Sequence, residues 1–124
     1  MSGPLWRILV ADDDPTVGLL ACAALAGSGF LPTVVDSGSA ALAAFRCEAF
    51  DIALLDVEMP GMDGLEVGAA IRRLRGEAFP IVLVTGRDDG EFLQRARLLA
   101  ATHIAKPVDW RTLPETLQQI LGVV

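Results

Sequence analysis

The sequence predicts an α/β domain in which a parallel sheet carries helices on both faces. Five short apolar, β-branched runs recur along the chain, and segments with helical spacing separate them. The runs are Ile8–Ala11, Thr33–Val35, Ile52–Leu55, Ile81–Val84 and His103–Ala105. Parallel strands require crossover helices, which bury both faces of the sheet. Pro32 precedes the second run, where a missing N–H is tolerated only near a sheet edge or a strand end.

Each run is followed by a segment in which apolar residues recur three and four positions apart, as in a helix that packs on a sheet. These segments are Val17–Leu25, Ala40–Phe45, Leu65–Leu74, Phe92–Leu99 and Leu117–Leu121. Asp14 is an N-cap residue before a proline at the first helical position. Thr112 and Glu115 have the spacing of a capping box, which predicts that the last helix begins at Leu113.

Length and composition suit one globular domain, which we expect to span residues 1–124 with a core of about 6–121. The net charge of −6 and the lack of a basic run argue against direct nucleic acid binding. The longest mostly apolar stretch, Gly18–Leu31, is too short to span a bilayer, so we expect no membrane insertion and a cytoplasmic location. Cys22 and Cys47 lack metal or redox spacing and are expected to be buried or half-buried thiols.

Polar residues follow the predicted strands at their carboxyl ends. Asp12 and Asp13 follow the first strand, Asp56 the third, Thr85 the fourth and Lys106 the fifth. Open α/β sheets bind ligands at this edge, where the ends of parallel strands meet. We therefore expect three carboxylates, one hydroxyl and one ammonium group to share one rim.

These residue types together favour phosphoryl chemistry with a divalent cation. Three converging carboxylates repel one another, and a hard cation relieves that repulsion; Mg²⁺ is the expected ion and Mn²⁺ an alternative. Asp56, placed rigidly by the strand before it, is suited to attack phosphorus and form an acyl phosphate. Lys106, the only lysine beside nine arginines, and the Thr85 hydroxyl would contact phosphoryl oxygens. Taken singly, each residue also fits a capping or strand-end role; the ordered combination is more specific.

The stretches that carry these residues resemble the receiver domain of two-component response regulators, from Arg7 to about Leu121. The matching stretches are Ile8–Pro15, Asp51–Gly64, Pro80–Gly86 and Ala105–Pro107. The second is the most specific, because an apolar strand, Asp56 and the run Met59–Gly64 occur in the order typical of the family. The resemblance implies a flavodoxin-like three-layer (βα)5 sandwich with a five-stranded parallel sheet in the order 2-1-3-4-5.

The resemblance also implies a role for each acidic residue. Asp56 would be the phosphoacceptor. Asp12 and Asp13 would hold Mg²⁺ together with Asp56, Asp13 directly. The backbone carbonyl of Glu58 would complete the protein ligands.

A second group of residues would sense the phosphoryl group. Thr85 and Lys106 would contact it, and Lys106–Pro107 would be a cis peptide. His103, the only histidine, stands where the family has an aromatic switch residue that turns inward as Thr85 moves. Histidine is small and can charge near neutral pH, so the switch would be weaker or pH-sensitive. His103 could equally be a half-exposed surface residue.

Three positions limit what the resemblance implies. Ala100 stands where glycine is common in the family. Glu58 and Arg87 occupy side-chain positions that vary and that border the attacking water in relatives, so the lifetime of the phosphoryl group is not predicted. The sequence also leaves open whether this is a free-standing regulator or part of a longer protein.

The function implied is phosphorelay signalling. A histidine kinase or histidine phosphotransfer protein would phosphorylate Asp56, and the face formed by the fourth helix, fifth strand and fifth helix would change for a downstream protein or output domain. Such a domain catalyses only its own phosphorylation and dephosphorylation, so it is not an enzyme for an external substrate. Two alternatives stay open: an Mg²⁺-dependent phosphohydrolase with an aspartyl nucleophile and Glu58 as acid/base, and a scaffold receiver that is not phosphorylated.

Overall fold

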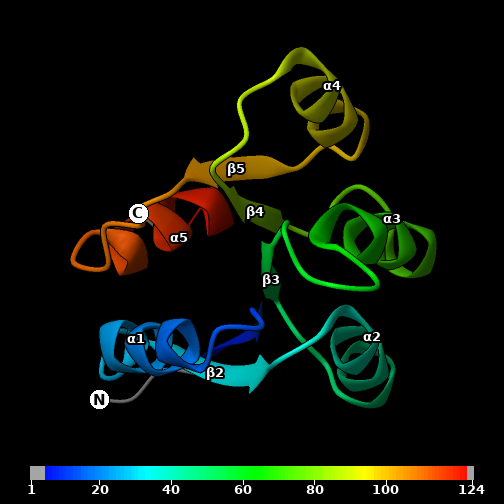
Figure 1. Cartoon of the computed structure of the whole chain (residues 1–124). Coiled ribbons are helices and arrows are strands. Elements are labelled where there is room, and N and C mark those ends of the chain that lie inside the picture. Colours follow the sequence, from blue (N-terminus) through cyan, green and yellow to red (C-terminus); the bar gives the residue numbers. More distant parts are fainter. Residues whose placement is uncertain (1–4, 123–124) are drawn as a thin grey trace.

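A computed structural model describes residues 5–122, which form one five-stranded sheet with all neighbouring strands parallel (Figure 1). The strands are β1 (Trp6–Ala11), β2 (Phe30–Val35), β3 (Ile52–Asp56), β4 (Ile81–Thr85) and β5 (Thr102–Ala105). Their order is β2-β1-β3-β4-β5, which confirms the predicted topology. The central strands β3 and β4 are buried at every position, as expected for strands covered on both faces.

Helices alternate with the strands and form the outer two layers. They are α1 (Pro15–Leu25), α2 (Gly38–Cys47), α3 (Gly64–Arg75), α4 (Gly90–Leu98) and α5 (Leu113–Leu121). Helices α1 and α5 pack on one face of the sheet, and α2, α3 and α4 lie on the other (Figure 1). No helix formed by residues 5–122 has the length and apolarity that a bilayer span requires.

Two hydrophobic cores lie on either side of the sheet because side chains alternate along each strand. Leu9 and Leu55 point into the core under α2, α3 and α4. Ile8 and Leu54 point into the core under α1 and α5. This arrangement leaves the strand ends free to present polar residues at one edge.

The second strand begins three residues earlier than predicted, at Phe30 rather than Thr33. Pro32 consequently lies inside the strand, paired with Ile8, instead of at its start. The missing N–H is tolerated because β2 is an edge strand of the sheet. The prediction of buried thiols is wrong, since Cys22 and Cys47 are both exposed on their helices.

Helix α5 begins at Leu113 as predicted, but the predicted capping box is absent. Thr112 has helical backbone angles, and its hydroxyl donates to the Asp109 carbonyl at 3.3 Å instead of capping the helix. A capping box is found in α3, where Asp63 accepts from the Glu66 N–H at 2.9 Å and Glu66 accepts from the Asp63 N–H at 3.0 Å. The Asp14 cap of α1 is confirmed.

An arginine from α3 donates hydrogen bonds to the turn between α4 and β5. The Arg72 guanidinium donates to the carbonyls of Leu99 at 2.5 Å, Ala100 at 3.2 Å and Phe79 at 2.5 Å. Ala100 has a φ of 52°, in the left-handed region that glycine adopts without strain. The family preference for glycine here thus has a physical reason.

We expect Ala100→Gly to raise the free energy of unfolding by about 0.5 kcal/mol. A left-handed alanine costs roughly 1–2 kcal/mol, and the gain is reduced by the greater freedom of glycine in the unfolded chain. Chemical denaturation of the parent and the variant measures the difference. Ala43→Gly, at an exposed site inside α2, is the matched control and should lower stability by about 1 kcal/mol. Equal losses in both variants would contradict the strain at Ala100.

Candidate functional site

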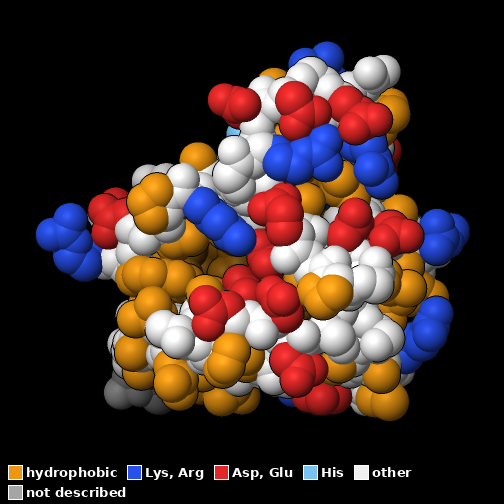
Figure 2. Space-filling model, viewed as in Figure 1, with side chains coloured by type: hydrophobic (Ala, Val, Ile, Leu, Met, Phe, Trp, Pro, Cys, Tyr) orange, Lys and Arg blue, Asp and Glu red, His pale blue; other side chains and the backbone are white. Residues whose placement is uncertain are grey.

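The structure brings the carboxylates of the strand ends together at the carboxyl edge of the sheet. One oxygen from each of Asp12, Asp13 and Asp56 lies within 4.8 Å of the other two. Figure 2 shows acidic side chains gathered near the centre of this face, with a basic side chain beside them. Asp12 and Asp13 follow β1, and Asp56 is the last residue of β3, its neighbour in the sheet.

Burial dominates the electrostatics of this cluster. Asp56 is 3% exposed and Asp12 is 6% exposed, whereas Asp13 is exposed to solvent. Burial is the largest cause that raises the pKa of Asp56 above its ordinary value; the nearby carboxylates raise it further, and the Lys106 ammonium lowers it. Burial likewise raises the pKa of Asp12, although its carboxylate accepts a hydrogen bond from the Asp14 N–H at 2.9 Å. The cluster therefore holds negative charge at an energetic cost.

Lys106 lies at the rim of the site and pairs with Asp56. Its Nζ is 2.8 Å from Asp56 Oδ1. Burial alone would lower the pKa of Lys106, but the neighbouring carboxylates, Asp56 above all, raise it beyond its ordinary value. The peptide bond from Lys106 to Pro107 is cis, as predicted.

Asp56 Oδ1 is buried and, within residues 5–122, accepts no hydrogen bond of normal geometry despite its proximity to the ammonium group. Buried carboxylate oxygens are otherwise almost always hydrogen-bonded. Among the described residues, the charge of this oxygen is offset only by the Lys106 ion pair, and it lies beside two further carboxylates. Three carboxylates of this kind form a donor set that a hard divalent cation prefers. The residues present thus fit the predicted Mg²⁺.

The backbone around Asp56 is fixed by two close contacts. The Val57 N–H donates to the Val84 carbonyl at 3.0 Å, which ties the end of β3 to β4. At Gly64, the first residue of α3, a Cβ atom would lie 2.4 Å from the Asp56 carbonyl oxygen. Only glycine permits this close approach, so Gly64 allows the loop after Asp56 to lie against the strand.

Thr85 is fully buried, and its hydroxyl makes two hydrogen bonds. It donates to Glu58 Oε2 at 2.7 Å and accepts from the Arg87 N–H at 2.9 Å. The other Glu58 oxygen, Oε1, lies 3.9 Å from Lys106 Nζ. The sequence predicted a metal-ligand role for the backbone carbonyl of Glu58 and, in the phosphohydrolase alternative, an acid/base role for its side chain; both stay predictions. The contact of its side chain with Thr85 was missed.

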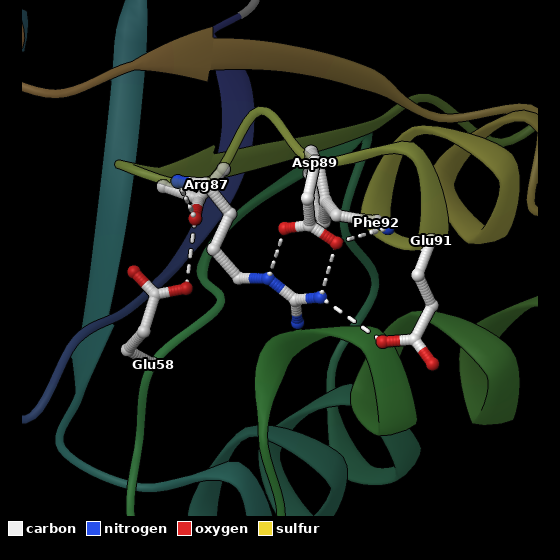
Figure 3. Close-up of polar contacts among 6 residues, drawn as sticks. Glu58, Arg87, Asp89, Glu91 and Phe92 are labelled. Carbon is white, nitrogen blue, oxygen red and sulfur yellow. Dashed lines mark hydrogen bonds and ion pairs between the residues drawn. The ribbon is translucent and has the colours of Figure 1, made fainter.

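The Arg87 side chain makes hydrogen bonds with residues at the start of α4 (Figure 3). Its guanidinium donates to both carboxylate oxygens of Asp89, the N-cap of α4, at 2.9 and 3.0 Å and to Glu91 at 3.2 Å. It also lies over the Phe92 ring at 5.6 Å from the centroid. The hydrogen bonds from Arg87 lower the pKa of Asp89 to about 2.

His103 lies on β5, exposed to solvent, and packs edge-on against Phe92 with ring centroids 5.6 Å apart. The histidine is thus a surface residue with one aromatic contact in this structure. Its predicted inward movement stays a prediction.

Comparison with known proteins agrees with this geometry. A model of the response regulator receiver domain matches residues 8–118. The chain is 33% identical to the transcriptional activator protein IrlR of Burkholderia pseudomallei over 116 residues, 93% of this chain and 50% of that protein. It is 31% identical to protein PilH of Pseudomonas aeruginosa over 118 residues, 94% of this chain and 98% of that protein.

A structural relative supports the same assignment. The crystal structure of a CheY-like response regulator receiver domain protein from Methanospirillum hungatei has a TM-score of 0.88 and 29% identity, covering 95% of this chain and 94% of that chain. The chain spans about half the length of IrlR and nearly all of PilH. Sequence match, strand order and acidic edge agree, and the chain belongs to the response regulator receiver domain family.

Proposed function

We propose that this receiver domain accepts a phosphoryl group on Asp56 and transmits its presence to the face formed by α4, β5 and α5. The observation that carries the proposal is the buried Asp56 carboxylate, with Asp12 and Asp13 oxygens within 4.8 Å and the Lys106 ammonium at 2.8 Å. One nucleophile, a cation-binding donor set and a positive side chain are what phosphoryl transfer to a carboxylate requires.

Asp12, Asp13 and Asp56, with the backbone carbonyl of Glu58, would hold Mg²⁺, and Mn²⁺ could take its place. When bound, the ion neutralises negative charge on the phosphoryl oxygens and on the cluster itself. The chain supplies the other elements. An Asp56 oxygen forms the new bond to phosphorus while the bond to the nitrogen of the donor histidine breaks, and the imidazole leaves. Lys106 pairs with a phosphoryl oxygen, and the Thr85 hydroxyl donates to another.

The expected partners follow from this chemistry. The donor is a histidine kinase or histidine phosphotransfer protein, and the recipient of the signal is a downstream protein or an output domain. We take residues 1–124 as a single receiver domain; the match of the family model to residues 8–118 supports this assignment. Catalysis is confined to its own phosphorylation and dephosphorylation. A cytoplasmic location and the lack of direct nucleic acid binding, both expected from the sequence, stay predictions.

The first prediction concerns the phosphoacceptor. Incubation with acetyl phosphate and Mg²⁺ should add one phosphoryl group to the parent protein and none to Asp56→Asn, because the amide is a poor nucleophile. Intact-mass analysis with and without EDTA measures the adduct. An equal adduct on Asp56→Asn would overturn the assignment. Sustained turnover of a phosphate monoester would instead favour the phosphohydrolase, and Mg²⁺-independent loading would exclude the metal site.

The second prediction concerns stability and pH. Because burial raises the Asp56 pKa above its unfolded value, its contribution favours folding below the unfolded pKa and is lost as pH rises through the folded pKa. At neutral pH without metal, the charge therefore destabilises the fold. We expect Asp56→Asn in EDTA to be more stable than the parent by about 1 kcal/mol, a difference that shrinks as pH falls towards about 4.

Excess Mg²⁺ should narrow this difference, because the ion stabilises the folded parent by mass action and binds the variant less well. Melting curves of both proteins, in EDTA and in Mg²⁺ at several pH values, provide the comparison. Asp109→Asn is a control of opposite sign, since hydrogen bonds from Arg111 lower the pKa of the exposed Asp109. A loss of stability in Asp56→Asn, with no effect of Mg²⁺ on either protein, would mean that the carboxylates form no metal site.

The third prediction concerns the switch. Thr85→Ala removes the hydroxyl that contacts Glu58 and Arg87, so it should leave Mg²⁺ binding nearly intact while uncoupling the output face. Backbone NMR shifts of residues 92–105, recorded before and after addition of beryllofluoride with Mg²⁺, test the coupling. Thr85→Ser keeps the hydroxyl and should respond like the parent. If Thr85→Ala responds like the parent as well, the coupling follows another route.

A further inference from the structure

The Glu58 carboxylate contacts the two side chains that the proposed function assigns to the phosphoryl group. Its Oε2 accepts the hydrogen bond of the Thr85 hydroxyl at 2.7 Å, and its Oε1 lies 3.9 Å from Lys106 Nζ. Figure 3 shows Glu58 reaching from the loop after β3 towards the end of β4. A carboxylate and a phosphoryl group both offer anionic oxygens to donors. Glu58 thus makes contacts of the kind expected from a phosphoryl group on Asp56.

A hydroxyl group has one hydrogen to donate, so Thr85 cannot serve both acceptors. Its oxygen is also engaged, since it accepts the N–H of Arg87 at 2.9 Å. The hydroxyl is therefore fixed from both sides while Glu58 holds it. A phosphoryl group on Asp56 gains the Thr85 hydrogen bond only after Glu58 has released it.

The hydrogen bond from the Arg87 N–H to the Thr85 hydroxyl restrains the segment that leads into α4. Arg87 is linked to Thr85 through its backbone N–H and to the α4 N-cap, Asp89, through its guanidinium. Its guanidinium also lies over Phe92, which packs against His103 on β5. The Thr85 hydroxyl is therefore the first in a series of contacts, through Arg87 and Phe92, that reaches the proposed output face. Fixing the hydroxyl restrains the first of these contacts.

We propose that the Glu58 side chain is an internal competitor for the phosphoryl site, which keeps Thr85 and Lys106 in the resting arrangement until a phosphoryl group displaces it. The inference rests on the proposed function and adds a positioning role for the Glu58 side chain, which the sequence considered only as the acid/base of a phosphohydrolase. Glu58 also brings a further negative charge to the cluster, so its displacement and the binding of a phosphoryl group are linked.

Three variants separate this competition from a general effect of charge. Glu58→Ala removes the carboxylate, and Glu58→Gln removes its charge but keeps an oxygen that can accept from Thr85. Glu115→Ala removes one charge from an exposed site in the first turn of α5. Beryllofluoride with saturating Mg²⁺ serves as the phosphoryl mimic. Its apparent Kd is measured from the NMR signal of the Arg87 amide, which reports directly on its hydrogen bond to Thr85.

We expect Glu58→Ala to lower the apparent Kd about tenfold, the scale of one charge-assisted hydrogen bond at a partly exposed site. The Kd of Glu58→Gln should fall between those of Glu58→Ala and the parent, and the Kd of Glu115→Ala should stay within about twofold of the parent because exposed charges are screened. In a Thr85→Ala background, Glu58→Ala should lose most of its effect, since the contested hydroxyl is gone. Melting curves confirm that each variant is folded.

The outcomes distinguish failure of the Glu58 competition from failure of the proposed function. A parent that binds beryllofluoride, with Glu58→Ala and Glu58→Gln at the parent's Kd or weaker, would overturn the competition and leave the proposed function intact. An equal decrease of the apparent Kd in Glu115→Ala would show that net charge causes the effect, and would also overturn the competition. A parent that gives no Asp56-dependent response to beryllofluoride would overturn the proposed function, and the inference with it.

Discussion

Burial of the Asp56 carboxylate at the end of β3 is the constraint on which the rest of the site depends. A buried charge is costly unless paired, and the pairing here is incomplete, because one ammonium group faces several carboxylates. The pKa of Asp56 is raised because the ion pair with Lys106 does not fully compensate the cost of burying its charge. A site in this condition gains stability from any cation that binds there, which is consistent with the proposed Mg²⁺.

The sheet makes this arrangement possible because its strands end together. Asp56 stands opposite Val84, one residue before Thr85, and Thr85 stands opposite Ala105, one residue before Lys106. Register alone thus places the Asp56 carboxylate, the Thr85 hydroxyl and the Lys106 ammonium group in steps along one edge. Hydrogen bonds between backbone atoms, such as that from the Gly64 N–H to the Val57 carbonyl at 3.1 Å, then fix the loops that follow.

Features that depend on strand order could be predicted from the sequence, and features that depend on side-chain direction could not. The alternation of apolar runs with helical segments predicted a parallel sheet with polar residues along one edge, and the resemblance to receiver domains implied the strand order. Helix α1 contains no charged residue, so its pattern did not show that Cys22 is exposed. Glu58 lies in a loop, where no periodicity fixes the direction of a long side chain, and its contact with Thr85 required coordinates.

For the proposed function, the contact of Glu58 with Thr85 also defines what phosphorylation would have to change. A ligand shifts a two-state equilibrium only by its difference in free energy between the states. If the Thr85 hydroxyl faced only water at rest, the phosphoryl group would gain the full hydrogen bond as driving force. With Glu58 as the resting acceptor, the gain is the difference between two anionic acceptors, which is smaller. In the proposed switch, the resting state would be correspondingly better populated, and the strength of the switch would depend on Glu58 as well as on the phosphoryl group.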